Sequence, residues 1–165
     1  MAVALGTTLI DLNIHNLDKE GGWQRIEEGL TTGADIFIGA GVTRRRAGGS
    51  RQIDLCGEQE ALFGFVLGYT QNASNTIDTQ GYYYRDYDAP FAAAKEVFIG
   101  VPKQGGIYLI LSETNVTLAL DMKLKCVDGV WSEADTNDNF QMMCEDPVTA
   151  AANTRKYFYG KWVSF

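Results

Sequence analysis

The chain has 165 residues, of which 45% are hydrophobic and 21% are charged, a composition that is ordinary for one globular domain and excludes wholesale disorder. Its 14 basic and 21 acidic residues give a formal net charge of -7. Because an acidic chain repels phosphate backbones, we expect no nucleic-acid partner. No apolar stretch approaches the ~18 residues that a membrane helix needs, so we expect no membrane partner either.

Residues 1–32 are predicted to form an N-terminal arm. Apolar and polar residues alternate over Ile10–His15, which suits a half-buried strand. Leucines at positions 5, 9 and 12 would also fit a short helix, so the conformation of the arm stays open. The first residues lack the basic region of a signal peptide, and we therefore expect the protein to be made in the cytoplasm.

Residues 33–165 are predicted to form a β-rich domain, because short apolar runs recur between glycine turns. We expect strands over 35–38, 53–55, 61–69, 96–101, 107–111 and 157–165, a hairpin of 123–127 with 130–131, and a long polar loop over 71–90. Asp146 and Pro147 can cap and begin a helix, which the alanine-rich stretch to Lys156 would continue. The predicted fold is mainly β: a small β-barrel or sandwich with an N-terminal arm and one short helix near the C-terminus.

The cysteines and the histidine do not form a catalytic or metal-binding pattern. Cys56, Cys126 and Cys144 are odd in number and have no CxxC spacing, so we interpret them as buried, reduced thiols. The single histidine, His15, lies on the arm, whereas a Ser-His-Asp or Cys-His device needs a histidine held in a shaped pocket. We therefore predict no catalytic residue, no cofactor and no metal, and a protein that is not an enzyme.

Two motif-like strings are interpreted as loops. Gly39-Ala40-Gly41 lacks the third glycine of a dinucleotide-binding fingerprint, and a turn between strands is the simpler interpretation. The acidic run over 135–139 begins like a calcium loop, but Phe140 stands where that loop has glycine and Asp146 where it has glutamate. This run is predicted to be a solvated acidic loop.

Aromatic and basic residues outside the predicted core are the candidates for binding. The only basic cluster, Arg44-Arg45-Arg46, is either a solvated loop or an ionic contact with the carboxylates of a partner. The stretch 82–88, with four tyrosines among acidic residues, suits a protein interface, a plain loop or sugar binding. The interface candidates are Ile10, Leu12, Ile14, Trp23, Arg44, Arg45, Arg46, Tyr83, Tyr84, Arg85 and Tyr87.

Several glycine-bounded strings, among them residues 33–43, Phe63–Gly68 and Val97–Pro102, are similar to those of capsid cement (decoration) proteins of tailed double-stranded DNA viruses. Those small β-rich proteins often end in an alanine-rich helix followed by a final strand, as Ala150–Phe165 is expected to do. The resemblance implies a virion protein on the capsid surface, assembled in the host cytoplasm. It would bind the major capsid protein, often as a homotrimer, and reinforce the lattice. Another virion β-protein, such as a tail-tube subunit, and a carbohydrate-binding β-domain stay open.

Overall fold

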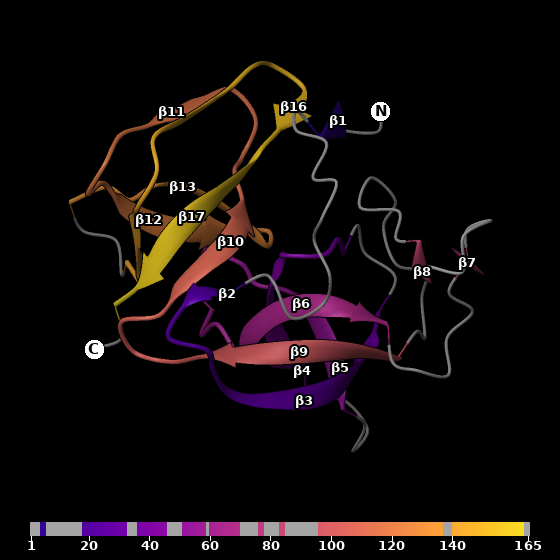
Figure 1. The fold of residues 1–165 in the computed structure, drawn as a ribbon. Helices are drawn as coiled ribbons and strands as arrows, with labels where there is room; N and C mark the ends of the chain where they lie inside the picture. Colours follow the sequence, from indigo (N-terminus) through magenta and orange to yellow (C-terminus); the bar gives the residue numbers. More distant parts are fainter. Residues whose placement is uncertain are drawn as a thin grey trace.

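The residues that the computed structural model describes are 4–5, 18–32, 36–45, 51–58, 60–69, 76–77, 83–84, 96–136 and 140–163. These residues form 17 strands and no helix (Figure 1). The prediction of a mainly β chain is therefore confirmed. The strands sort into one closed barrel, one six-stranded sheet and three two-stranded ribbons.

Five strands close into the barrel in the order β3–β5–β4–β6–β9. They are β3 (Trp23–Thr31), β4 (Gly41–Arg45), β5 (Gln52–Leu55), β6 (Gly64–Tyr69) and β9 (Glu96–Pro102). The longest pairing joins β3 and β9 antiparallel, and β9 also pairs antiparallel with β6. Close approach of these strands requires glycine, because a Cβ at Gly64 would lie 2.6 Å from the carbonyl oxygen of Gly100.

The six-stranded sheet lies against the barrel, with the order β13–β12–β14–β17–β10–β2. Its strands are β2 (Asp18–Glu20), β10 (Ile107–Leu111), β12 (Lys123–Val127), β13 (Val130–Glu133), β14 (Met142–Cys144) and β17 (Tyr157–Trp162). The turn between β12 and β13 places Asp128 at φ 47° and Gly129 at φ 80°. Two positive φ angles are what a two-residue hairpin turn needs, and the hairpin predicted there is confirmed.

Strand β10 is the structural centre, because its side chains enter two different hydrophobic cores. Leu109 and Leu111 pack into the first core with Val66 and Ile99 of the barrel. Tyr108 and Ile110 point to the other side and enter the second core, together with Trp131, Phe65, Phe158 and Met142. Alternation along a strand sends neighbouring side chains to opposite faces, and here both faces are buried. The barrel and the sheet therefore form one packed unit.

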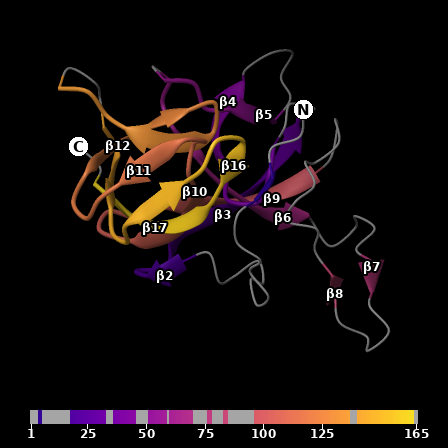
Figure 2. The ribbon, with the colours of Figure 1, turned by 90° about the horizontal axis from the view of Figure 1, so that it is seen from above.

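Three short ribbons complete the fold. They are β11 (Val116–Leu118) with β15 (Val148–Ala150), β1 (Ala4–Leu5) with β16 (Thr154–Arg155), and β7 (Thr76–Ile77) with β8 (Tyr83–Tyr84). The parallel pairing of β1 with β16 joins the N-terminal part of the chain to its C-terminal part. Seen from above, the β7–β8 ribbon stands apart from the barrel and the sheet (Figure 2).

The helix predicted to begin at Pro147 is wrong. Residues 148–150 form β15, which pairs antiparallel with β11, and a turn with Asn153 at φ 58° follows. Val148 and Ala150 are buried whereas Thr149 between them is exposed, a period of two that belongs to a strand. The Asp146 carboxylate pairs with Lys19 at 3.8 Å. Tertiary pairing and burial have overridden the helix propensity of the alanines.

Three further predicted segments differ in detail. No strand forms in the described part of the segment 35–38, where Ile36–Ile38 are buried but irregular in conformation. The Ile38 carbonyl accepts a hydrogen bond from the Tyr157 hydroxyl at 2.7 Å. The strand expected over 61–69 begins only at Gly64. The predicted arm, residues 1–32, contains β2 and β3, which pair with β10 and β9. Part of the predicted arm is therefore paired with the sheet and the barrel, and the domain boundary at residue 32 stays a prediction.

Candidate functional site

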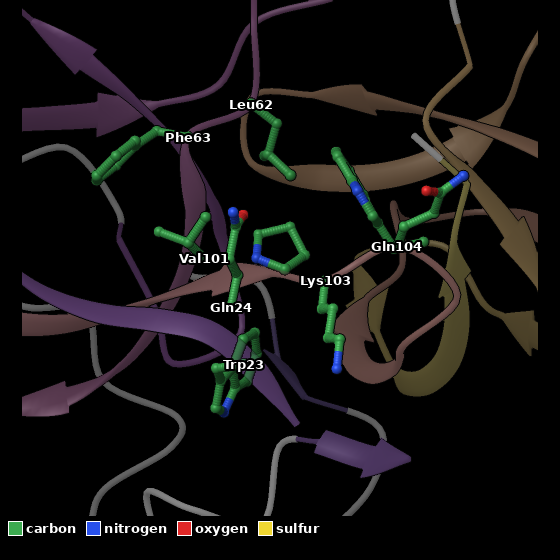
Figure 3. Close-up of a pocket in the computed structure, with 9 residues that line it drawn as sticks. Trp23, Gln24, Leu62, Phe63, Val101, Lys103 and Gln104 are labelled. Carbon is green, nitrogen blue, oxygen red and sulfur yellow. The ribbon is translucent and has the colours of Figure 1, made fainter. Parts of the chain in front are cut away.

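A surface depression lies where the first residues of β3 meet the turn between β9 and β10 (Figure 3). Its volume is about 530 Å³. Six of its nine lining residues are apolar or aromatic, and the other three are polar and exposed. The lining residues are Trp23, Gln24, Leu62, Phe63, Val101, Pro102, Lys103, Gln104 and Trp162.

Trp23 is held in this depression by aromatic packing. Its ring stacks on Tyr108 with a centroid distance of 4.4 Å and an interplanar angle of 24°, and it lies tilted against Phe65 at 6.1 Å. Gly100 makes the room, because a Cβ there would lie 2.5 Å from Cε3 of Trp23. The indole is partly exposed while most of its neighbours are buried. Trp23 therefore presents a fixed aromatic surface to whatever enters the depression.

The rim of the depression is fixed by one buried hydroxyl. The Tyr108 hydroxyl donates a hydrogen bond to the carbonyl of Gly22 at 2.7 Å and accepts one from the backbone N–H of Lys103, also at 2.7 Å. On the other side, the backbone N–H of Trp162 donates to the carbonyl of Gly106 at 2.8 Å. Three segments that are distant in sequence are thereby fastened together, so a ligand meets a site that is already formed.

Of the predicted basic cluster, Arg44 borders the depression, and both Arg44 and Arg45 are paired with carboxylates of the same chain. Arg44 donates a hydrogen bond to Glu27 and lies over the ring of Phe63, with 4.1 Å between its Cζ and the ring centroid. Arg45 donates to Glu60 at 2.8 Å and lies 3.5 Å from a carboxylate oxygen of Asp54. From the sequence, these arginines could lie in a solvated loop or contact the carboxylates of a partner. In the structure, the carboxylates that contact Arg44 and Arg45 belong to the same chain.

The Glu27 carboxylate accepts hydrogen bonds from both Arg25 and Arg44, and these contacts affect its pKa. The pKa of the Glu27 carboxyl lies below its ordinary value, first because Arg25 donates a hydrogen bond to it, and further because Arg44 does. Burial acts in the opposite direction. Lys103, in contrast, forms no ion pair with any other residue that the structure describes, and it is exposed on the rim. The rim thus carries one positive charge that a partner's carboxylate can approach.

The structure brings together only some of the predicted interface residues. Arg44 and Trp23 both reach the depression, Arg44 through its contact with Phe63. Tyr83 and Tyr84 form β8, whose backbone pairs with β7 away from this site. Arg45 pairs with Glu60 and Asp54 of the same chain. The other candidates lie outside the described residues: Ile10, Leu12, Ile14, Arg46, Arg85 and Tyr87. The hypothesis that they anchor a partner stays a prediction.

Eight lining residues were not predicted, because no local pattern marks them. Leu62 and Phe63 lie before β6, Pro102 ends β9 and Lys103 follows it, and Trp162 ends β17. The one sequence feature that could have indicated them is weak: they include large apolar residues next to turns, at positions where no regular strand would bury them. Such residues are common beside any glycine turn, and only the tertiary structure shows which of them meet.

Other kinds of chemistry find little support among the residues described. No group of three His, Cys, Asp or Glu side chains there is placed to hold a metal ion. His15 and Asp138 lie outside those residues. Asp135 is exposed and lies 3.9 Å from the Lys125 ammonium. In the same part of the chain, no helix is long and apolar enough to span a membrane.

Comparison with known proteins does not assign the chain to a family. No family model and no curated protein matches the chain. What the chain offers is therefore its fold and its surface: a mainly β unit with a preformed aromatic depression. Such a surface is typical of protein–protein contacts, in which tryptophan and other aromatic residues act as anchors within a polar rim.

Proposed function

We propose that this protein is a structural protein of a virus capsid. It binds the major capsid protein on the outer surface of the lattice and stabilises the shell as a cement (decoration) protein, acting as a homotrimer on the virion and not as an enzyme. One observation carries the proposal: the preformed depression around Trp23, with an apolar floor and a polar rim. The mainly β fold and the glycine-bounded strands that resemble cement proteins support it.

The composition of the depression favours a protein partner over a small-molecule substrate. Ligand pockets place a few polar groups so that they converge on one point. Here the polar side chains, Gln24, Lys103 and Gln104, are exposed on the rim, whereas the aromatic surfaces lie at the floor. Apolar anchors surrounded by a solvated rim are the arrangement of an interface hot spot.

A capsid lattice also compensates for a small contact area. A depression of this size accommodates one or two side chains of a partner, which gives modest affinity for a single contact. On a lattice, several copies joined in one oligomer bind together, and the effective concentration of the second and third contacts raises the overall affinity 10²–10⁴-fold, by order of magnitude. Multivalent binding to a repeated surface is therefore the setting in which this depression suffices.

The test is co-sedimentation of the purified protein with bare capsids of its virus. The variant is Lys103→Glu combined with Gln104→Glu, which places two negative charges on the rim without touching the packed floor. The matched control is Thr117→Glu combined with Thr149→Glu on the exposed face of the β11–β15 ribbon. We expect the control to pellet with capsids as the unmodified protein does, and the rim variant to bind at least about tenfold more weakly, because docking would desolvate the added charges.

Three outcomes would count against the proposal. If the rim variant and the control both sediment with capsids like the unmodified protein, the depression is not the attachment surface. If the unmodified protein fails to bind capsids and assembles into stacked rings in negative-stain images, a tail-tube role replaces the proposed one. A glycan-array signal that is lost on substitution of Tyr83 and Tyr84 would instead favour the carbohydrate-binding domain.

A further inference from the structure

Two of the three cysteines lie together where the barrel meets the six-stranded sheet. Cys56 follows β5 of the barrel and is fully buried, and Cys126 lies in β12 of the sheet with 6% of its surface exposed. The Cys126 thiol donates a hydrogen bond to the backbone carbonyl of Cys56, with 3.5 Å between Sγ and O. The two residues are 70 positions apart in the chain, so only the tertiary fold brings them together.

The backbone around this pair is tightly fixed. The N–H of Gly129 donates to the Cys56 carbonyl at 2.9 Å, the N–H of Cys56 donates to the Gly41 carbonyl at 3.0 Å, and the N–H of Gly41 donates to the Gly129 carbonyl at 2.8 Å. This closed ring of three hydrogen bonds joins β4, the end of β5 and the β12–β13 turn. A Cβ at Gly41 would come within 3.0 Å of the Cys126 sulfur. The Cys126 thiol is therefore held against the backbone of Cys56 at a rigid joint.

The two thiols also differ in reactivity. The pKa of Cys56 is lowered, mainly by its contact with the Cys126 side chain, and the pKa of Cys126 is raised well above its ordinary value by that same contact and by burial. Cys56 is thus the member of the pair that ionises first, and the thiolate is the nucleophilic form of cysteine. Cys144 stands apart: its thiol donates to the Asp146 carbonyl at 3.2 Å, and burial raises its pKa to about 11.

We propose that Cys56 and Cys126 are a site of disulfide formation that locks the barrel to the sheet when the protein meets a peroxide. The Cys56 thiolate attacks one oxygen of hydrogen peroxide, the O–O bond breaks, and a sulfenic acid forms as hydroxide leaves and takes up a proton as water. The sulfur of Cys126 then attacks the Cys56 sulfur. Its thiol proton leaves with the departing hydroxide as a second water, and the S–S bond forms. Two thiols are oxidised and one peroxide is reduced to two waters.

This proposal extends the view of the cysteines as buried thiols. The reduced pair is the state expected in a reducing cytoplasm, and the cross-link forms only where an oxidant is present. The bond would close a long loop that contains β6, β9 and β10, the strands on which both hydrophobic cores depend. It does not depend on the proposed capsid function.

The test uses the full chain, reduced and then freed of reductant. Each sample is treated with hydrogen peroxide, quenched and unfolded, and its free thiols are counted with a thiol reagent. Cross-linked peptides are then mapped by mass spectrometry. We expect the unmodified protein, which has three cysteines, to keep one free thiol and to yield a peptide that links Cys56 to Cys126 within one chain. Cys144→Ser is the matched control and should lose both of its thiols to the same link.

Three results would overturn the inference. The first is that the unmodified protein and Cys144→Ser both keep all their thiols under conditions that fully oxidise a model dithiol. The second is that the linked peptide contains Cys144, and the third is that links form only between chains, seen as dimers on a non-reducing gel. Cys126→Ser should give no intrachain link. Because the unmodified protein and Cys144→Ser decide the matter between them, a folding defect in Cys126→Ser leaves the test intact.

Discussion

Replacement of Tyr108 by phenylalanine isolates the hydroxyl that fastens the rim of the depression. The change keeps the ring, so the stacking on Trp23 and the packing in the second core remain. It removes two hydrogen bonds of 2.7 Å, one to the Gly22 carbonyl and one from the Lys103 N–H. Each hydrogen bond contributes ~1 kcal/mol net, so we expect Tyr108→Phe to lower the free energy of unfolding by about 2 kcal/mol.

The assay is urea unfolding, followed by tryptophan fluorescence and analysed at constant slope, with Tyr159→Phe as the matched control. The Tyr159 hydroxyl makes no hydrogen bond within the part of the chain that the structure describes, so its removal should change the free energy of unfolding by less than about 0.5 kcal/mol. If Tyr108→Phe is no more destabilising than Tyr159→Phe, the hydroxyl does not hold the Gly22 turn to the β9–β10 turn. The account of a preformed rim would then be refuted.

Two other changes test the barrel. Gly100→Ala should lower the free energy of unfolding by about 1–3 kcal/mol, because the new Cβ would overlap the ring of Trp23. Gly57→Ala is the control and should be tolerated, since its Cβ would meet only the Glu60 side chain at 3.4 Å. Equal stability of the two variants in thermal unfolding would contradict the close packing of Gly100 on Trp23. Glu27→Gln should reduce stability near neutral pH, because the hydrogen bond from Arg25 lowers the pKa of Glu27 in the folded state. That contribution to stability is present above the ordinary glutamate pKa of about 4.3 and is lost as the pH falls through the lower folded-state pKa. The free energies of unfolding of the unmodified protein and of Glu27→Gln should therefore become equal in acid. A difference between them that does not depend on pH would count against the ion pair.

Much of the β architecture could be predicted from local patterns. Alternating or continuous apolar runs bounded by glycine and by Asp128-Gly129 correctly indicated strands β9, β10, β12, β13 and β17. These signals depend only on neighbouring residues and on the backbone angles that glycine permits. The helix near Pro147 failed for a physical reason: alanine favours a helix by less than 1 kcal/mol per residue, whereas pairing Val148 with Leu118 buries both side chains.

The site was less predictable, because it is assembled from segments that are distant in the chain. Trp23 was predicted as an interface residue since a large aromatic ring after two glycines had no core within the arm. Gln24 is its neighbour in β3. The other lining residues come from the ends of β9 and β17, from the β9–β10 turn and from the residues just before β6, and their meeting depends on the closure of the barrel. Arg44 and Arg45 were noticed as cations, but their carboxylate partners come from other parts of the chain.

The most direct test of the central claim is an electron cryomicroscopy map of capsids saturated with the purified protein, at a resolution that places Trp23 and Phe63. The account predicts that the depression around these two residues faces the major capsid protein and holds side chains of that protein, while the β11–β15 ribbon faces solvent. A map in which the protein is bound but the depression faces solvent, with another surface against the shell, would contradict it.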